Sequence, residues 1–100
     1  MLPSHRSPTH PGEMLLEEFL KPANVTQVVA AKRMHMPLNR LNEIIHAKRG
    51  VSADSALLFS KLTGTSAEFW LSVQASYDLR HAQQAQAKRR VRVKPLAVSA

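Results

Sequence analysis

Residues 25–49 have the sequence VTQVVAAKRMHMPLNRLNEIIHAKR, and their pattern predicts two short helices joined by a tight turn. Thr26 suits the N-cap of the first helix, because its hydroxyl accepts a hydrogen bond from a free backbone N–H of the first turn. The pair Met36-Pro37 interrupts the helical pattern, since proline disfavours helical geometry in the residue before it and suits the first position of a new helix. One apolar face repeats between these points at helical spacing, formed by Val29, Ala30 and Met34.

The helix that follows Pro37 has one apolar side and one polar side. Its apolar side carries Leu41, Ile44 and Ile45. At about 100° per residue, the opposite side carries Asn39, Glu43 and His46, with Arg40 and Asn42 on its flanks. Two helices, a turn of about three residues and a polar outer face form a helix-turn-helix pattern. This pattern spans about residues 26–46.

The polar outer face of the second helix suits duplex DNA. The major groove of B-form DNA admits one α-helix, whose exposed side chains reach the base edges. Asn39 is suited to a bidentate pair with adenine and Arg40 to one with guanine, and each such contact is worth roughly 1–3 kcal/mol of discrimination. An ordinary helical hairpin with a solvated polar face explains the same spacing, so the pattern alone leaves both interpretations open.

The flanks of the pattern carry groups that suit a phosphate backbone. The helix start at Thr26 and Gln27 offers free backbone N–H groups to a phosphate. Lys48 and Arg49 supply positive charge just after the second helix. These four residues are therefore the expected phosphate contacts.

Composition indicates one small domain with a basic tail. The chain has 100 residues, of which 44% are hydrophobic, and its formal net charge is +7. Most of this charge lies in residues 88–100, which hold five Lys or Arg and no acid, whereas residues 1–87 hold nine basic and seven acidic residues. Basic chains favour anionic partners, either nucleic acid or anionic lipid. The absence of cysteine excludes disulfides and thiol chemistry.

The sequence carries no targeting or membrane signal. Its N-terminus has Pro3, Pro8 and Pro11 and no apolar run, unlike a signal peptide. No stretch approaches the roughly 18 apolar residues that span a bilayer. We therefore expect a cytoplasmic protein that does not enter a membrane.

The segments before the helix-turn-helix are expected to be an arm and one helix. Residues 1–9 are rich in proline and serine, which predicts a flexible arm. A helix is expected from Pro11 to about Leu20, with its inner side formed by Met14, Leu15 and Phe19 and possible help from Leu16. The neighbouring acids Glu17 and Glu18 sit about 100° apart on such a helix, so they do not converge on one point as a catalytic pair does.

Two further helices are expected after Gly50. Ser52 suits the N-cap of the first, Gly64 suits its C-terminal end, and its buried side is expected to be Ala56, Leu57, Phe59 and Leu62. Thr65 and Glu68 have the spacing of a capping box, which predicts that the last helix starts at Ser66. That helix carries apolar residues that form either core or, in part, a dimer seam: Phe69, Trp70, Val73, Tyr77 and Leu79.

The domain is expected to span residues 10–87, because AQQAQA at 82–87 extends the last helix. The remaining residues, 88–100, predict a basic disordered tail, with a specific DNA-binding arm as the alternative.

Three pieces of sequence together resemble the HigA-type (VapI-like) addiction-module antitoxins, which belong to the wider helix-turn-helix class of phage repressors. These are HPGEMLLEEFL before the helix-turn-helix, the helix-turn-helix itself, and KRGVSADSALLFSKLTGTSAEFWLSVQASYDLR after it. The resemblance covers about residues 10–81. It implies an all-α, five-helix, repressor-like fold and a homodimer that binds an inverted repeat in its own promoter. It also implies a partner, a HigB-type toxin that is a ribosome-dependent mRNA endonuclease.

The resemblance also assigns roles to individual positions. Gln27 falls where such repressors contact a phosphate, and Lys48 and Arg49 follow the recognition helix as in the family. The positions that meet base edges are Leu38, Asn39 and Glu43, with Arg40 close by. By its helical phase Leu38 leans toward the apolar side, so a thymine methyl group is its expected partner if it reaches DNA.

One position departs from the family pattern. His35 stands in the turn where the family usually has glycine, so a positive φ there would carry some strain. A metal site that joins His35 with His46 or His81 would need converging partners, and no ligand spacing is present. No metal, cofactor or enzyme activity is expected, because the sequence has no nucleophile–base pairing and no phosphate-binding glycine loop.

Other functions compete with an autorepressing antitoxin. One is a protein-interaction module that binds a toxin without reading DNA, and another is a repressor without a toxin partner. A third is a non-specific binder of nucleic acid or anionic membranes that acts through the tail.

Overall fold

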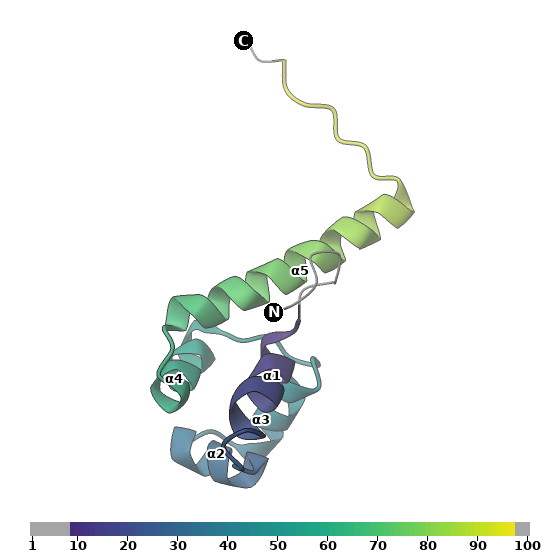
Figure 1. The fold of residues 1–100 in the computed structure, drawn as a ribbon. Helices are drawn as coiled ribbons and strands as arrows, with labels where there is room; N and C mark the ends of the chain where they lie inside the picture. Colours follow the sequence, from purple (N-terminus) through teal and green to yellow (C-terminus); the bar gives the residue numbers. More distant parts are fainter. Residues whose placement is uncertain (1–8, 98–100) are drawn as a thin grey trace.

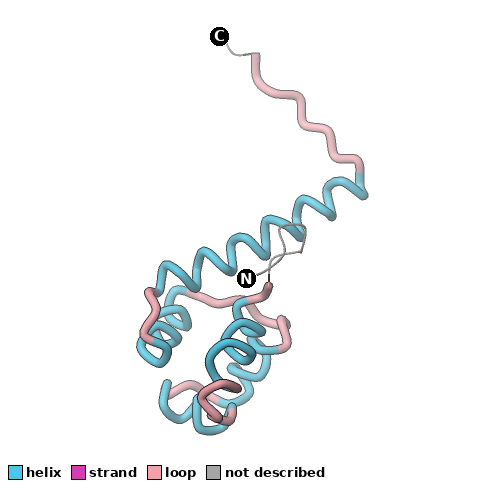
Figure 2. Tube along the Cα trace, viewed as in Figure 1, coloured by secondary structure: helices cyan, strands magenta, loops and turns pink. Residues whose placement is uncertain are grey.

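A computed structural model describes residues 9–97, in which all regular structure is helical (Figures 1 and 2). The predicted all-α, five-helix fold is therefore confirmed. The arm expected at residues 1–9 lies almost entirely outside the described residues. The helices are α1 (Pro11–Met14), which continues directly into η1 (Leu15–Leu20), then α2 (Gln27–Met34), α3 (Leu38–Ile45), α4 (Ala53–Thr63) and α5 (Ala67–Arg89).

The first helix changes its hydrogen-bond pattern along its length. It begins at Pro11 as expected, and η1 is a π-helix, in which each N–H bonds to the carbonyl five residues earlier. This spacing places Leu15 and Leu20 on the same side, and both are buried. The prediction at α-helical spacing missed Leu20. Phe19 packs against the core as predicted and is partly buried.

Three aromatic rings surround Trp70, one of them buried with it in the core and two of them nearer the surface. Trp70 and Phe59 are fully buried, and their ring centroids lie 5.2 Å apart in an edge-to-face arrangement. Phe69 and Phe19 contact the same indole at centroid distances of 5.0 and 5.5 Å. The indole Nε1 donates to the hydroxyl of Thr65 over 2.7 Å, so the polar end of the tryptophan is satisfied inside the core.

This use of Thr65 corrects the predicted capping box. The N-cap of α5 is Ser66, whose Oγ accepts from the backbone N–H of Phe69 at 3.1 Å. Thr65 instead accepts from Trp70, a contact that only the folded chain brings about. The two other predicted helix ends are confirmed, because Ser52 caps α4 through Ser55 and Gly64 ends it with φ of 79°.

Four residues predicted on the apolar faces of their helices are exposed instead: Val29, Leu57, Phe69 and Leu79. In α2 the buried side is Ala30, Ala31 and Met34, so the small side chains face the neighbouring helices and the valines face outward. Small residues allow helices to pack closely, and hydrophobicity alone did not reveal this preference.

The last helix extends past the body of the domain. α5 lies across α4 and α1 with its first half and continues as a projecting arm with its second half (Figure 1). It ends at Arg89, so Lys88 and Arg89 belong to the helix and not to the tail. Cations are favourable in the last helical turn, because the carbonyls there carry partial negative charge. Residues 90–97 follow without regular structure and are exposed.

His10 joins the start of α1 to α5 and makes the fold sensitive to pH. It is buried, its Nδ1 accepts from the N–H of Gly12 at 3.0 Å, and its ring meets Tyr77 edge-on with centroids 4.7 Å apart. Burial lowers the pKa of His10 below 6.5, and His81 adds to this effect, while Asp78 and Glu13 oppose it.

Because the folded chain binds this proton less readily than the unfolded chain, stability is full above pH 6.5 and is expected to fall as the pH drops below that value. Thermal unfolding between about pH 8 and pH 5 measures this loss. The variant His10→Asn keeps a capping oxygen and removes the titration, so its melting temperature should depend less steeply on pH. An equal pH dependence in both proteins would contradict this role of His10.

Candidate nucleic-acid interface

The pair α2 and α3 forms the predicted helix-turn-helix. Thr26 caps α2 by accepting from the N–H of Val29 at 3.2 Å, as expected. The turn begins at His35, which has φ of 54° and ψ of 39° and so adopts the left-handed conformation considered for it. Met36 is buried beneath the turn, and Pro37 precedes the first residue of α3. The histidine therefore takes the position of a glycine without opening the turn.

The outward side of α3 exposes the predicted reading residues. Leu41, Ile44 and Ile45 are buried, as predicted, and fix the rotation of the helix. Asn39 is exposed, while Arg40 and Glu43 are partly covered. Leu38 is 45% exposed, which corrects the inference that it leans toward the apolar side. It is the first residue of α3, where no preceding turn of the helix covers it.

A polar side-chain pair joins the two helices at this surface. The Nδ2 of Asn42 donates to the Oε1 of Gln27 over 3.3 Å. This bond fixes the position of the Gln27 amide and leaves its NH₂ group free to donate to a phosphate. The sequence placed Asn42 only on the flank of the helix, and the pairing was missed because the two residues are fifteen positions apart.

The structure brings Glu43 and Arg49 together. The Nε of Arg49 lies 2.9 Å from the Oε1 of Glu43, and both side chains are about half exposed. Exposed ion pairs of this kind contribute little to stability, about 0–1 kcal/mol. The pair instead orients the guanidinium and offsets the one acidic charge of α3 beside the reading residues. Lys48, next to this pair, is exposed.

A hollow follows this pair between the end of α3 and the start of α4. Its volume is about 250 Å³. It is lined by two arginines and by residues before and within the start of α4: Arg40, Arg49, Gly50, Ser52, Asp54 and Ser55. The start of α4 therefore lies close to both arginines, a proximity that has no local signature in the sequence.

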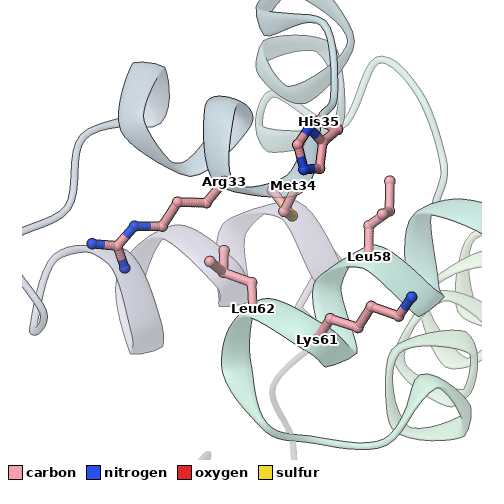
Figure 3. Close-up of a pocket in the computed structure, with 6 residues that line it drawn as sticks. All are labelled: Arg33, Met34, His35, Leu58, Lys61 and Leu62. Atoms are coloured by element: carbon pink, nitrogen blue, oxygen red, sulfur yellow. The ribbon is translucent and has the colours of Figure 1, made fainter.

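A second hollow lies between the C-terminal end of α2 and the second half of α4 (Figure 3). Its volume is about 380 Å³, and it has an apolar floor and a basic rim. The floor is formed by Met34, Leu58 and Leu62, and the rim by Arg33, His35 and Lys61. Figure 3 shows the Arg33 side chain extended away from the floor.

The described residues contain no candidate metal site and no membrane-spanning helix. Within residues 9–97, no three His, Cys, Asp or Glu side chains are grouped so that they could hold a metal ion. In the same part of the chain, no helix combines the length and the apolar character needed to cross a bilayer.

The chain is similar in sequence to several known proteins. No protein-family model matches it. It is 44% identical over 75 residues to virulence-associated protein I of Dichelobacter nodosus, covering 75% of this chain and 69% of that protein. It is 37% identical to antitoxin HigA-1 of Vibrio cholerae over 99% of this chain and 93% of that protein.

A solved structure extends the likeness to three dimensions. The Pseudomonas aeruginosa antitoxin HigA, solved with the higBA promoter, superposes with a TM-score of 0.82 at 34% identity. The match covers 90% of this chain and 99% of that one. Sequence and structure agree along nearly the whole domain, and the chain belongs to the HigA-type (VapI-like) family of helix-turn-helix antitoxins.

Proposed function

We propose that this chain is the antitoxin of a type II toxin–antitoxin module and represses its own promoter as a DNA-binding dimer. The observation that carries the proposal is the outward side of α3, where Leu38 and Asn39 are exposed beside Arg40. The relative from Pseudomonas aeruginosa was solved with a promoter, which supports promoter binding by this chain.

The proposed contacts divide into two groups. The base-reading group on α3 consists of Leu38, Asn39, Arg40 and Glu43. Asn39 and Arg40 supply the bidentate chemistry for adenine and guanine, and Leu38 supplies a methyl surface for thymine. The phosphate-binding group surrounds α3 and consists of Thr26, Gln27, Lys48 and Arg49. Phosphate contacts fix the position of a protein on the duplex, and base contacts give it specificity.

We propose that the homodimer forms along α5. Leu71, Ala75 and Leu79 recur every four residues on this helix and are exposed. Residues at this spacing share one helix face, so they form an apolar stripe without a partner in the monomer. A second copy that covers this stripe would place two recognition helices about a two-fold axis, as an inverted repeat requires.

The variant Leu79→Glu tests this dimer. Leu79 is 61% exposed, so the substitution should leave the monomer folded. Loss of a buried leucine costs about 1.5–3 kcal/mol, and the symmetric dimer loses two, so its dissociation constant should rise by roughly 100-fold or more. Analytical ultracentrifugation measures it, with Leu96→Glu in the exposed tail segment as the control. An unchanged dissociation constant in Leu79→Glu would place the dimer contact elsewhere.

Besides DNA and a second copy of the chain, the proposed partner is a HigB-type toxin. The relatives of this chain are antitoxins and transcription regulators, and we propose that it likewise acts in the cytoplasm by binding and without catalysis or a cofactor. A bound antitoxin neutralises a ribosome-dependent nuclease by covering it. The exposed acids of the first helix, Glu13, Glu17 and Glu18, would suit a basic ribonuclease.

Two assays test the proposed function directly. In the first, fluorescence anisotropy compares a duplex from the DNA that precedes the chain's own reading frame with a duplex of shuffled sequence. The proposal expects tighter binding to the first, by at least tenfold. In the second, co-expression of the chain should restore growth to cells that produce the toxin encoded beside it. Toxin neutralisation without preference for the promoter would favour an interaction module that does not read DNA.

A further inference from the structure

We propose that Gln74 of α5 is a positioning residue for the phosphate contacts made after the recognition helix. It acts on the connecting segment, residues 46–50, which joins α3 to the loop before α4 and carries Lys48 and Arg49. This inference rests on the proposed DNA-binding function and adds to it a buried residue that lies on another helix.

Gln74 is buried and holds the residue that follows the connecting segment. Its exposed fraction is 9%, and its Oε1 accepts from the backbone N–H of Val51 at 2.7 Å. Its Nε2 donates to the Oδ1 of Asp78 over 2.9 Å. Asp78 therefore fixes the orientation of the amide, because the carboxylate accepts only from the NH₂ side and turns the carbonyl oxygen toward Val51.

The connecting segment is held at its other end by α3. The N–H of Lys48 donates to the carbonyl of Glu43 at 2.8 Å, and the Arg49 side chain pairs with the Glu43 carboxylate. Ala47 between them has φ of 60°, a left-handed conformation that a non-glycine residue keeps only when its surroundings fix it. Gln74 supplies the second fixed point, so the segment is held at both ends.

Gly50 allows this arrangement. A Cβ added there would lie 3.2 Å from Cδ of Gln74 and 3.3 Å from both atoms of the amide head. The absence of a side chain at residue 50 therefore lets the backbone approach the Gln74 amide closely enough for Val51 to reach it. Among the side-chain hydrogen bonds of residues 9–97, the one between Val51 and Gln74 alone joins α5 to this part of the chain.

The base contacts and the phosphate contacts are therefore expected to depend on different parts of the fold. The apolar side of α3 fixes the rotation of this helix, so base reading by Leu38, Asn39 and Arg40 does not depend on Gln74. The phosphate contacts of Lys48 and Arg49 depend on where the connecting segment lies. Loss of the Gln74 bond should therefore reduce the number of phosphate contacts and leave base discrimination in place.

The test compares four full-length proteins: wild type, Gln74→Met, Gln74→Glu with Asp78→Asn, and Gln84→Met. Gln74→Met keeps the length of the side chain and removes both hydrogen bonds. The double variant exchanges donor and acceptor: the new carboxylate accepts from the Val51 N–H and from the new amide at position 78. Gln84→Met is the matched control, because Gln84 is exposed on the same helix.

The readout is the salt dependence of binding to a duplex selected by the wild type. Gln74→Met should lower the slope of log affinity against log salt by about 0.9 for each lost phosphate contact on duplex DNA. Its preference for the selected duplex over single-base variants should stay unchanged. The double variant and Gln84→Met should both show the wild-type slope. A residue with a purely structural role would lower the melting temperature without changing the slope.

Two results would overturn the inference: an unchanged slope in Gln74→Met, or a slope that falls together with base discrimination. Hydrogen exchange on the free proteins separates this failure from failure of the proposed function. In Gln74→Met the amides of residues 47–51 should exchange faster, while those around Leu41 and Trp70 keep their protection. This expectation does not depend on sequence-specific DNA binding by the wild type. Unchanged exchange at these amides would contradict the positioning role of Gln74.

Discussion

Replacing Gly12 with alanine is expected to lower the free energy of unfolding by about 3 kcal/mol or more, at the upper end of the range for overpacked cores. A Cβ at this position would collide with the carbonyl oxygen of Ile44 and would lie 2.7 Å from the Cα of Ile45. All of these atoms are backbone, so no side chain can rotate to relieve the contact. The first helix would have to move away from the end of the recognition helix.

Urea unfolding followed by the fluorescence of Trp70, the single tryptophan, measures this loss. The control is Gly64→Ala, where nothing lies within 4 Å of an added Cβ and only the positive φ opposes the change. That variant should lose about 1–2 kcal/mol. Failure of Gly12→Ala to fold agrees with the expected loss, whereas a stability within about 1 kcal/mol of wild type would contradict the close approach.

The second large effect is expected from the double substitution Asn39→Ala with Arg40→Ala. Two lost base contacts remove about 2–6 kcal/mol of discrimination, or roughly 30-fold to 10⁴-fold in preference for the operator over random duplex. Neither side chain lies in the core, since Asn39 is exposed and Arg40 is only partly covered. The free energy of unfolding should therefore change by less than about 1 kcal/mol.

Competition binding with operator and random duplex measures this preference. The matched control is Arg80→Ala with Gln83→Ala, which removes the same charge and a similar amide from the exposed side of α5. That control should keep the full preference. A double variant at residues 39 and 40 that binds the operator as well as wild type would remove α3 from the reading surface.

Local chemistry predicted much of the fold. Thr26, Ser52 and Gly64 each act within a few residues of their own position, and the structure confirms all three helix ends. Thr65 and Ser66 show where this reasoning stops. Both are suitable caps, and the choice between them follows from the indole of Trp70, which takes the Thr65 hydroxyl. Such a competition depends on tertiary packing and has no local signature.

Burial was predicted less well than helix boundaries. The valines of α2 have the stronger hydrophobic signal, yet the alanines are buried and the valines are exposed. Leu20 was missed because π-helical spacing changes which residues share a side. Neither the distance between helices nor a change of helix type is encoded in a simple period.

The candidate interface was likewise predicted only in part. The apolar side of α3 predicted which residues face outward, and Asn39 is exposed as this requires. The pairs Gln27 with Asn42 and Glu43 with Arg49 were not predicted, because each depends on how one segment lies against another. Gln74 has no local signature either, because its bond to Val51 joins residues that are 23 positions apart.

The central claim, that α3 of a symmetric dimer reads DNA sequence, is tested most directly by in vitro selection of random duplex DNA near physiological salt. The full-length protein should recover an inverted repeat whose half-sites lie about 10 base pairs apart or at a multiple of that spacing. Asn39→Ala with Arg40→Ala should lose the motif while retaining salt-sensitive binding. Recovery of no motif by the wild type, with binding that collapses as salt rises, would contradict the claim, because only attraction to phosphates would remain.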